Sequence, residues 1–351
     1  MPLMLQGRRI PEAWGGKPSV GTGRHGSSAP SLRIALVNNM PDPAFEDTGR
    51  QFFTLLNSAV GDHNAVLQLF SLPQVIRGER VLEHFHAAYS DIHDLFNGQF
   101  DGVVITGTEP LKHNLREEAY WAALTGLFDW AERNTTSAVL SCLAAHASVL
   151  HSDGIERCPL GDKQFGVFEF PKSDHALMNL NTGSVRFPHS RWNEVRKDDL
   201  IAHGYSVLTH SPEGGVDCFI KRKKQSLFVH FQGHPEYDTQ TLLKEYRRDV
   251  KRFLRAERET YPNMPRGYFD ATTAQLLDEF RDKALCNRHE DFMTQFPDSS
   301  VPAAPVNTWH DSAVSIYRNW LQFIAERKDE RRAFTPQVAH SVAVPARNEI
   351  A

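Results

Sequence analysis

The segment SAVLSCLAAHASVLH, residues 137–151, joins two kinds of local structure at a single cysteine. Residues 138–140 form a short apolar run that is typical of a buried strand, whereas residues 143–150 are rich in small and aliphatic helix formers. Cys142 stands between them, where the strand would end and the helix would begin. A strand, a tight turn and a helix in this order are typical of an α/β protein.

The chain on both sides of this segment repeats the same alternation. Further strand-like runs lie at 32–40, 65–72, 100–107 and 226–231, and helical patterns lie at 48–61, 117–133 and 239–256. The stretch 210–231 reads as a hairpin, and 196–211 is expected to supply further antiparallel strands. We therefore expect an α/β fold with a mostly parallel central sheet flanked by helices and a small antiparallel addition.

The composition sets limits on the class of protein. The chain has 351 residues, 40% of them hydrophobic, and a formal charge of −4, so it lacks the basic field that holds nucleic acid. We see no run of about 20 apolar residues and no signal-peptide core, which predicts a cytoplasmic protein without a membrane partner. The four cysteines form no CxxC pair, which disfavours a disulfide framework or a zinc site.

Both ends of the chain differ from its middle. Residues 1–31 are rich in Gly, Ser and Pro, and the stretch from 326 to 351 loses its periodicity after a charged start. We expect a flexible N-terminal arm (1–31), one catalytic domain (32–325) and a flexible C-terminal tail (326–351).

Cys142 is the first candidate for chemistry. At a strand–helix junction, the helix N-terminus would favour the thiolate, and the backbone N–H of Leu143 would face a developing oxyanion. The alternative is a buried structural cysteine, because free cysteines are among the most buried residue types. The local pattern is compatible with both, since Leu143 and Ala144 stand where a glycine would ease the turn.

A second motif, FVHFQGHPEYD (228–238), supplies a base for this thiol. His234 and Glu236 lie two positions apart at the end of an expected strand, so their side chains would point the same way, and Pro235 stiffens the turn. A thiol nucleophile needs an imidazole to take its proton and a carboxylate to orient that imidazole. The alternative is a solvated loop histidine, one of 17 in the chain. His146 and His151 are rival bases, of which His146 is expected to pack along the helix.

Several motifs, in order, resemble the homoserine O-succinyltransferase and O-acetyltransferase family. They are LVNNMP (36–41), VVITGTEP (103–110), AYWAAL (119–124), LSCLAAHASVLH (140–151), DKQFGVFE (162–169), PHSRWNEV (188–195), GHPEYDTQTLLKEYRRDV (233–250) and NTWHDSAVSIYRNWL (307–321). The resemblance implies a class I glutamine-amidotransferase-like (flavodoxin-like) fold. It also implies acyl transfer from succinyl-CoA or acetyl-CoA to homoserine in methionine biosynthesis, with the acyl-CoA as a co-substrate, no bound cofactor, and a homodimer.

The resemblance also assigns roles to single residues. Cys142 matches the nucleophile, His234 its general base and Glu236 the orienting carboxylate. The substrate-binding positions correspond to Lys163, Ser190 and Arg248, and the position linked to acyl specificity is Leu111. Judged without the motif, Arg248 would be read as a surface arginine.

Two departures from the family pattern affect these expectations. Asp42 and Pro43 stand where the family carries basic residues, in what the sequence suggests is a slightly longer loop. Leu111 is neither the glycine nor the glutamate that goes with acyl preference, which leaves the donor open, and serine is a possible acceptor. Two other classes stay open at this stage: a glutaminase with the same triad, and a non-catalytic binding protein. The histidines of 84–94 have irregular spacing and predict no metal site.

Overall fold

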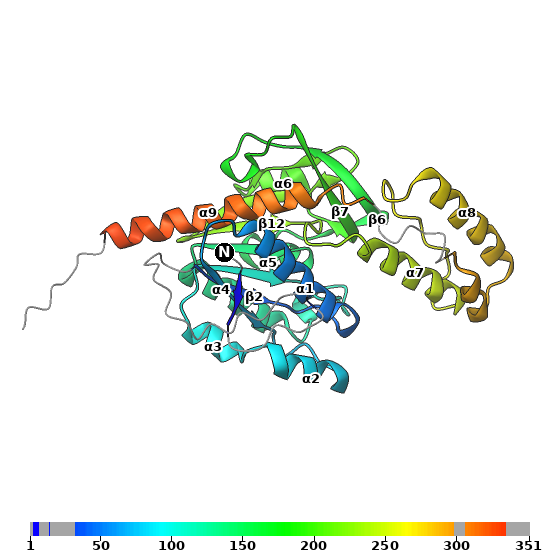
Figure 1. The fold of residues 1–351 in the computed structure, drawn as a ribbon, viewed down its shortest axis with the longest axis horizontal. Helices are drawn as coiled ribbons and strands as arrows, with labels where there is room; N and C mark the ends of the chain where they lie inside the picture. The colour runs from blue at the N-terminus through cyan, green and yellow to red at the C-terminus, as the bar shows by residue number, and fades with distance from the viewer. Residues whose placement is uncertain (1–2, 7–13, 15–31, 298–305, 335–351) are drawn as a thin grey trace, which may run out of the picture.

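An eight-stranded sheet forms the centre of the molecule in the computed structural model, which describes residues 3–6, 14, 32–297 and 306–334 (Figure 1). The strand order is β1-β3-β2-β4-β5-β12-β11-β8. The strands from β1 to β12 along this order are all parallel to one another. The next strand, β11, pairs antiparallel with both β12 and β8. The bounds are β1 (Met4–Leu5), β2 (Leu32–Val37), β3 (Ala65–Phe70), β4 (Gly102–Thr106), β5 (Ser137–Ser141), β8 (Ser206–Val207), β11 (Cys218–Lys223) and β12 (Ser226–Phe231). This arrangement confirms the expected α/β class, the mostly parallel sheet and the hairpin.

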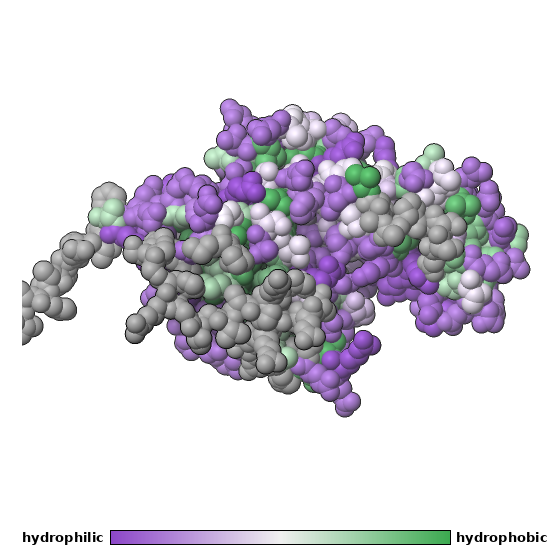
Figure 2. Space-filling model, in the orientation of Figure 1, coloured by the Kyte–Doolittle hydropathy of each residue, from purple (hydrophilic) through white to green (hydrophobic). Residues whose placement is uncertain are grey.

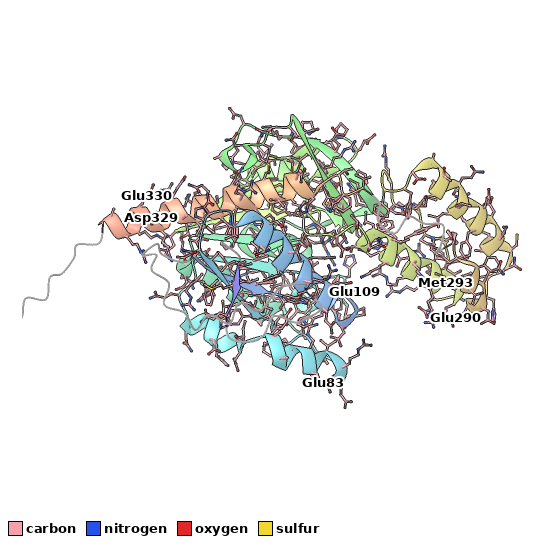
Figure 3. The ribbon with its side chains drawn as sticks, viewed as in Figure 1. Glu83, Glu109, Glu290, Met293, Asp329 and Glu330 are labelled. Atoms are coloured by element: carbon pink, nitrogen blue, oxygen red, sulfur yellow. The ribbon has the colours of Figure 1, made fainter. Side chains whose placement is uncertain are left out.

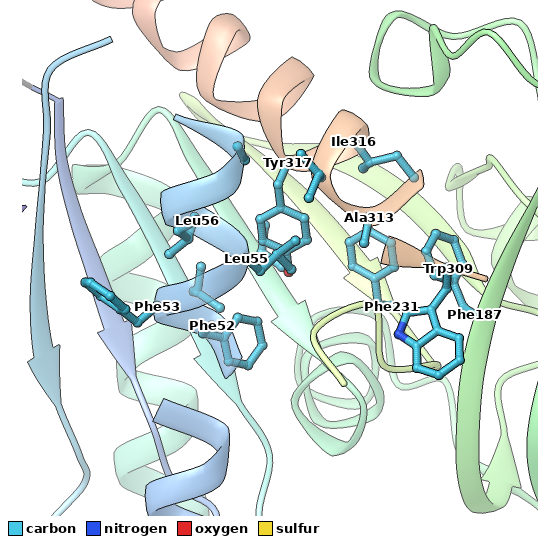
Figure 4. Packing of buried hydrophobic residues seen from close by; sticks show 14 of the residues in the cluster. Phe52, Phe53, Leu55, Leu56, Phe187, Phe231, Trp309, Ala313, Ile316 and Tyr317 are labelled. Carbon is cyan, nitrogen blue, oxygen red and sulfur yellow. The ribbon is translucent and has the colours of Figure 1, made fainter. Parts of the chain in front are cut away.

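Helices cover both faces of the sheet. Side chains alternate along each strand, so Val104 and Val139 face one hydrophobic cluster while Val103 and Ala138 face the other. Figure 4 shows the first cluster, where Leu55 and Leu56 of α1 lie near Tyr317 of α9. The helices on that face are α1 (Asp42–Ala59), α2 (Glu79–Ala88) and α9 (His310–Phe334), and those on the other are α3 (Ile92–Asn97), α4 (Trp121–Asn134), α5 (Leu143–Asp153) and α6 (Lys197–Ala202).

Two further parts lie outside the central sheet. A long antiparallel hairpin consists of β6 (Cys158–Pro171) and β7 (Ser184–Glu194), and its register is irregular between Pro159 and Gln164. A helical lobe built from α7 (Thr241–Leu254) and α8 (Ala271–Cys286) projects from the body (Figure 1), and its outer surface is largely hydrophilic (Figure 2). The smaller elements are η2 (Leu115–Glu117), η3 (Ala176–Met178), β9 (His210–Ser211), β10 (Gly215–Val216) and η4 (Glu290–Gln295). None of the helices in the described ranges is long and apolar enough to cross a membrane.

Several boundaries differ from the sequence expectation. The long β6–β7 hairpin was not expected, and residues 196–211 form α6 before they reach the short strands β8 and β9. Within the expected N-terminal arm, β1 pairs with β3 and Trp14 is buried. At the other end α9 continues to Phe334, past the expected boundary at 325, whereas 335–351 lie outside the described residues.

The first helix begins earlier than expected. The segment after β2, which the sequence suggested was a loop, is the first turn of α1, with Pro41 as its N-cap and Asp42 and Pro43 at its start. Proline is favoured in the first turn because its missing N–H would have no helical partner there, and an acidic side chain interacts favourably with the helix dipole. The expectation of a longer loop was therefore wrong for a local reason: both residues are good helix starters.

Candidate active site

Cys142 occupies the turn between β5 and α5 with backbone angles of φ 51° and ψ −111°. A positive φ is uncommon for a residue with a side chain. Its N–H donates to the carbonyl of Phe231 on β12 (2.8 Å), and its carbonyl accepts from the N–H of Ala145 (3.0 Å) as the helix begins. The side chain is only partly buried. The turn thus holds the thiol at the carboxyl edge of the sheet in a strained conformation of the kind that clusters at functional sites.

The close approach that this turn requires is made possible by a glycine in a neighbouring loop. Gly107 follows β4, and a Cβ built on it would lie 2.4 Å from the Cβ of Leu143 and 3.0 Å from the N atom of Ala144. No side chain fits at Gly107 unless the turn moves. The cysteine motif itself has no glycine, and the space that the turn needs is provided by Gly107, immediately after the adjacent strand β4.

His234 and Glu236 lie together beside the turn that carries the thiol. His234 Nδ1 lies 2.8 Å from Glu236 Oε1, and only 6% and 3% of these side chains are exposed. Cys142 lies close enough to the His234 ring to help raise the pKa of that imidazole, and Nε2 is the ring nitrogen that the bond to Glu236 leaves free. Ser141 donates a longer hydrogen bond to Glu236 Oε1 (3.4 Å). The order cysteine, imidazole, carboxylate is that of a nucleophile, its base and the group that orients the base.

The electrostatics of this group favour a charged imidazole. Burial alone would lower the pKa of His234, but the negative charges of Glu236 and Cys142 outweigh burial and raise that pKa well above 6.5. A positively charged imidazole beside a sulfur is the environment in which catalytic cysteines are found.

A second cluster of charges lies beside the first. Lys163 Nζ, at the irregular part of β6, lies 3.1 Å from Asp249 Oδ2 and 3.3 Å from Glu245 Oε2. Ser190 of β7 donates to Glu245 (2.5 Å), and Arg248 lies 3.0 Å from Asp249 Oδ1. Glu245 and Asp249 are one turn apart on α7, so they present two carboxylates on one face of the helix. Two cations and two carboxylates thus meet at one place.

Tyr237 connects the two clusters. Its ring stacks on His234 at a centroid distance of 4.2 Å, and its hydroxyl donates to Glu245 Oε1 (2.8 Å). The charged cluster therefore lies one aromatic ring away from the imidazole.

The match to known proteins covers most of the chain. The family model for homoserine O-succinyltransferase matches residues 25–331. The chain belongs to the homoserine O-succinyltransferase family. A homoserine O-succinyltransferase from Rhodopseudomonas palustris is 43% identical over 300 residues, covering 85% of this chain and 90% of the relative. One from Bradyrhizobium japonicum is 41% identical over 297 residues, covering 84% and 90%. A solved glutamine amidotransferase from Thermotoga maritima has a TM-score of 0.44 at 10% identity, covering 85% of this chain and 99% of that one.

In this member of the family, the structure brings six of the expected residues into two adjoining clusters. Cys142 lies near His234, which bonds to Glu236, and Lys163, Ser190 and Arg248 gather around the α7 carboxylates. The backbone N–H of Leu143 is at the first position of α5, where helical N–H groups have no partner within the helix. The chemical roles of these residues stay predictions.

Three residues at this site were missed from the sequence. They are Tyr237, Glu245 and Asp249, and the last two carried a usable signal because their spacing of four places them on one helical face. The rival bases do not contact the thiol in this arrangement. His146 bonds to Gln232 (2.8 Å) and is buried, which lowers its pKa to about 3, and His151 pairs with Asp129 (3.0 Å).

Asp42 and Pro43 replace the expected basic residues, yet a cation lies beside this turn. Arg77 reaches it from a later segment, pairs with Asp42 (3.3 Å) and donates to the carbonyl of Met40. Asp42 also accepts from the N–H of Gly78 (2.7 Å). Arg77 and Gly78 thus tie the start of α1 to the segment that precedes α2 and hold the shape of this turn.

The loop after β4 carries the remaining candidate. Leu111 is 86% exposed and lies in this loop, which Glu118 fixes by accepting from the N–H of Lys112 (2.6 Å). Glu109, labelled in Figure 3, is close enough to Arg248 to contribute to raising its pKa, an increase that burial opposes and that Asp249 drives most strongly. The loop thus approaches the charged cluster. Among the described residues, no group of three or more His, Cys, Asp or Glu could hold a metal ion.

Proposed function

We propose that this chain transfers a succinyl group from succinyl-CoA to the hydroxyl of homoserine through a thioester on Cys142. The observation that carries the proposal is a partly exposed cysteine on a strained turn, close enough to raise the pKa of a buried histidine that lies 2.8 Å from Glu236. The names of the curated relatives support succinyl as the acyl group.

The first half-reaction is an exchange of thioesters. The Cys142 thiolate attacks the thioester carbonyl of succinyl-CoA, and negative charge develops on the carbonyl oxygen near the N–H of Leu143. The C–S bond to CoA then breaks, and CoA leaves as a thiolate that takes the proton held by His234. One thioester replaces another, so the acyl-enzyme keeps the energy needed for the next step.

The second half-reaction uses the same residues in the opposite sense. His234, now neutral, removes the proton of the homoserine hydroxyl as its oxygen attacks the acyl carbon. The C–S bond to Cys142 breaks, an ester forms, and the thiolate returns beside the imidazolium. Glu236 keeps the imidazole in one tautomer throughout.

The charged cluster fits an amino-acid acceptor. Homoserine carries one carboxylate and one ammonium group, and the site offers two cations, Lys163 and Arg248, beside two carboxylates, Glu245 and Asp249. A guanidinium grips a carboxylate with two parallel hydrogen bonds, which makes Arg248 the better partner for the substrate carboxylate. The ammonium group would take the place that Lys163 Nζ now shares with the two carboxylates.

Steady-state assays with matched substrates test the proposal. CoA release is measured with succinyl-CoA or acetyl-CoA, each with homoserine or serine, together with ammonia release from glutamine. We expect the highest kcat/KM for succinyl-CoA with homoserine. A preference for acetyl-CoA would contradict only the identity of the acyl donor. Release of ammonia without release of CoA would contradict acyl transfer as a whole and indicate a glutaminase.

We also propose that the chain works as a homodimer, which rests on the family resemblance. Sedimentation equilibrium measures the mass directly. A mass equal to one chain across the assay concentrations would contradict it.

A further inference from the structure

Three buried side chains pack next to the backbone that leads into His234 and take no part in the proposed reaction. Arg191 Nε donates to His189 Nδ1 (3.2 Å), and His189 Nε2 lies 3.2 Å from Asp217 Oδ1. His189 and Asp217 are fully buried, and Arg191 is 3% exposed. Two of the three belong to the PHSR motif (188–191), of which only Ser190 takes part in the charged cluster.

The hydrogen bonds of this group define its protonation. Because His189 Nδ1 accepts from Arg191, a neutral ring carries its proton on Nε2, which faces Asp217. Burial lowers the pKa of His189 to about 4, so the ring is neutral at neutral pH. Two further donors of Arg191, one on Nη1 and one on Nη2, bond to the carbonyls of Asn193 (2.8 Å) and Gly214 (2.9 Å). A neutral imidazole thus lies between a buried cation, which donates to its Nδ1, and a buried carboxylate, 3.2 Å from its Nε2.

This group holds the backbone that leads into His234. Asp217 Oδ1 accepts from the N–H of Gly233 (3.0 Å), and the carbonyl of Asp217 accepts from the N–H of Gln232 (2.8 Å). The N–H of His234 itself donates to the carbonyl of Pro188 (2.8 Å), the residue before His189. Three successive N–H groups are therefore fixed by Asp217 and by the strand that carries His189.

The backbone at Gly233 packs tightly against the side chains of His189 and Asp217. A Cβ built on Gly233 would lie 2.6 Å from Asp217 Oδ1 and 2.7 Å from His189 Nε2. Real Cβ atoms do not approach other atoms this closely, so the imidazole and the carboxylate press against the backbone immediately before the base. A displacement of His189 would be transmitted to His234 over a single residue.

We propose that Arg191, His189 and Asp217 form a positioning unit that sets the orientation of His234 toward Cys142. The inference rests on the proposed function, in which His234 is the base of Cys142. The three residues act through Gly233 and do not touch the reacting atoms, so they are positioning residues. A misplacement of about 1 Å far from the chemistry can lower a rate about 100-fold, which makes such support a requirement for the reaction.

The test compares two buried histidines. His189→Gln removes the unit, and His230→Gln is the matched control. His230 is also fully buried, and its ring stacks on Phe219 at a centroid distance of 4.5 Å. We expect His189→Gln to lower kcat about 100-fold with KM within about twofold, and His230→Gln to leave kcat within about threefold. Equal kcat values in the two variants would overturn the inference.

A second readout needs no substrate. Alkylation of Cys142 by iodoacetamide at neutral pH is followed by peptide mass spectrometry, with the exposed thiol of Cys286 as the reference in the same sample. We expect His189→Gln to slow the reaction of Cys142 about tenfold relative to Cys286, because the imidazole no longer faces the sulfur. An unchanged ratio would contradict the positioning role even if activity were lost.

Arg191→Lys keeps the inference testable if His189→Gln does not fold. Lysine retains the positive charge but lacks the planar Nε donor that His189 accepts, so we expect a folded protein with kcat lowered about tenfold. A wild-type kcat would overturn the inference. If the proposed function were wrong, the results would differ. Cys142→Ala would still transfer the acyl group, whereas His189→Gln would still slow the alkylation of Cys142 relative to Cys286.

Discussion

Replacing Glu236 by glutamine tests how much the carboxylate contributes to the chemistry. The substitution keeps the shape and an acceptor oxygen, but it removes the negative charge that lies 2.8 Å from His234 Nδ1. Both side chains are almost fully buried, so water screens the lost interaction poorly. The corresponding loss in a serine-protease triad is about 10⁴-fold, and we expect kcat to fall about 10³- to 10⁴-fold here, or about 4–5 kcal/mol of transition-state stabilisation.

The assay follows the loss of thioester absorbance at saturating homoserine, with KM determined for both substrates. The control is Glu83→Gln, an exposed glutamate on α2 that is labelled in Figure 3, for which we expect wild-type kinetics. A loss of less than about threefold in kcat for Glu236→Gln would refute the reasoning that the carboxylate orients and stabilises the imidazolium.

The same variant changes how stability depends on pH. Because the folded pKa of His234 is raised, its contribution to the free energy of unfolding is full below the ordinary value of about 6.5 and is lost as pH rises through the folded pKa. Without the charge of Glu236, this pH dependence should shrink. Urea unfolding of both proteins on either side of neutral pH measures it, and identical pH dependence in the two would contradict the assigned cause.

Three further perturbations test other parts of the account. Glu245→Gln should raise KM for homoserine about tenfold while kcat stays within about threefold, because it weakens substrate binding beside Lys163; a fall in kcat alone, in steady-state kinetics, would contradict a binding role. Asp153→Asn should cost about 1–2 kcal/mol near neutral pH and much less below pH 2, because hydrogen bonds from Lys221, Tyr205 and Lys223 outweigh burial and lower the pKa of Asp153 to about 2. This contribution is present above about pH 4 and is lost as pH falls through 2, and acid titration of urea stability that shows no such difference would count against it. Gly107→Ala should cost about 1–3 kcal/mol and lower kcat about tenfold or more, because its Cβ would push on Leu143; kinetics and melting temperature equal to those of the wild type would exclude the proposed close packing.

Local patterns in the sequence were sufficient for part of the fold and of the site. Apolar runs and helical periodicity located β2, β3, β4, β5 and β12, because each such element shows its burial pattern within a few residues. The grouping of Cys142 with His234 and Glu236 followed from two short motifs, because the carboxyl ends of neighbouring parallel strands β5 and β12 meet at one edge of the sheet.

The charged cluster could not be predicted in the same way. Lys163 lies 86 residues from Asp249 in the chain, and they meet only because the β6–β7 hairpin folds back onto α7. The start of α1 differs from the expected loop because Asp42 and Pro43 both favour the first turn of a helix. Long-range packing decided the first case, and a local preference was overlooked in the second.

Intact mass spectrometry of the wild type and of Cys142→Ala, after brief exposure to succinyl-CoA without homoserine, tests the central claim most directly. The account predicts a mass gain of one succinyl group in the wild type, none in Cys142→Ala, and loss of the adduct when homoserine is added. No adduct in the wild type, or the same adduct in both proteins, would contradict a thioester on Cys142.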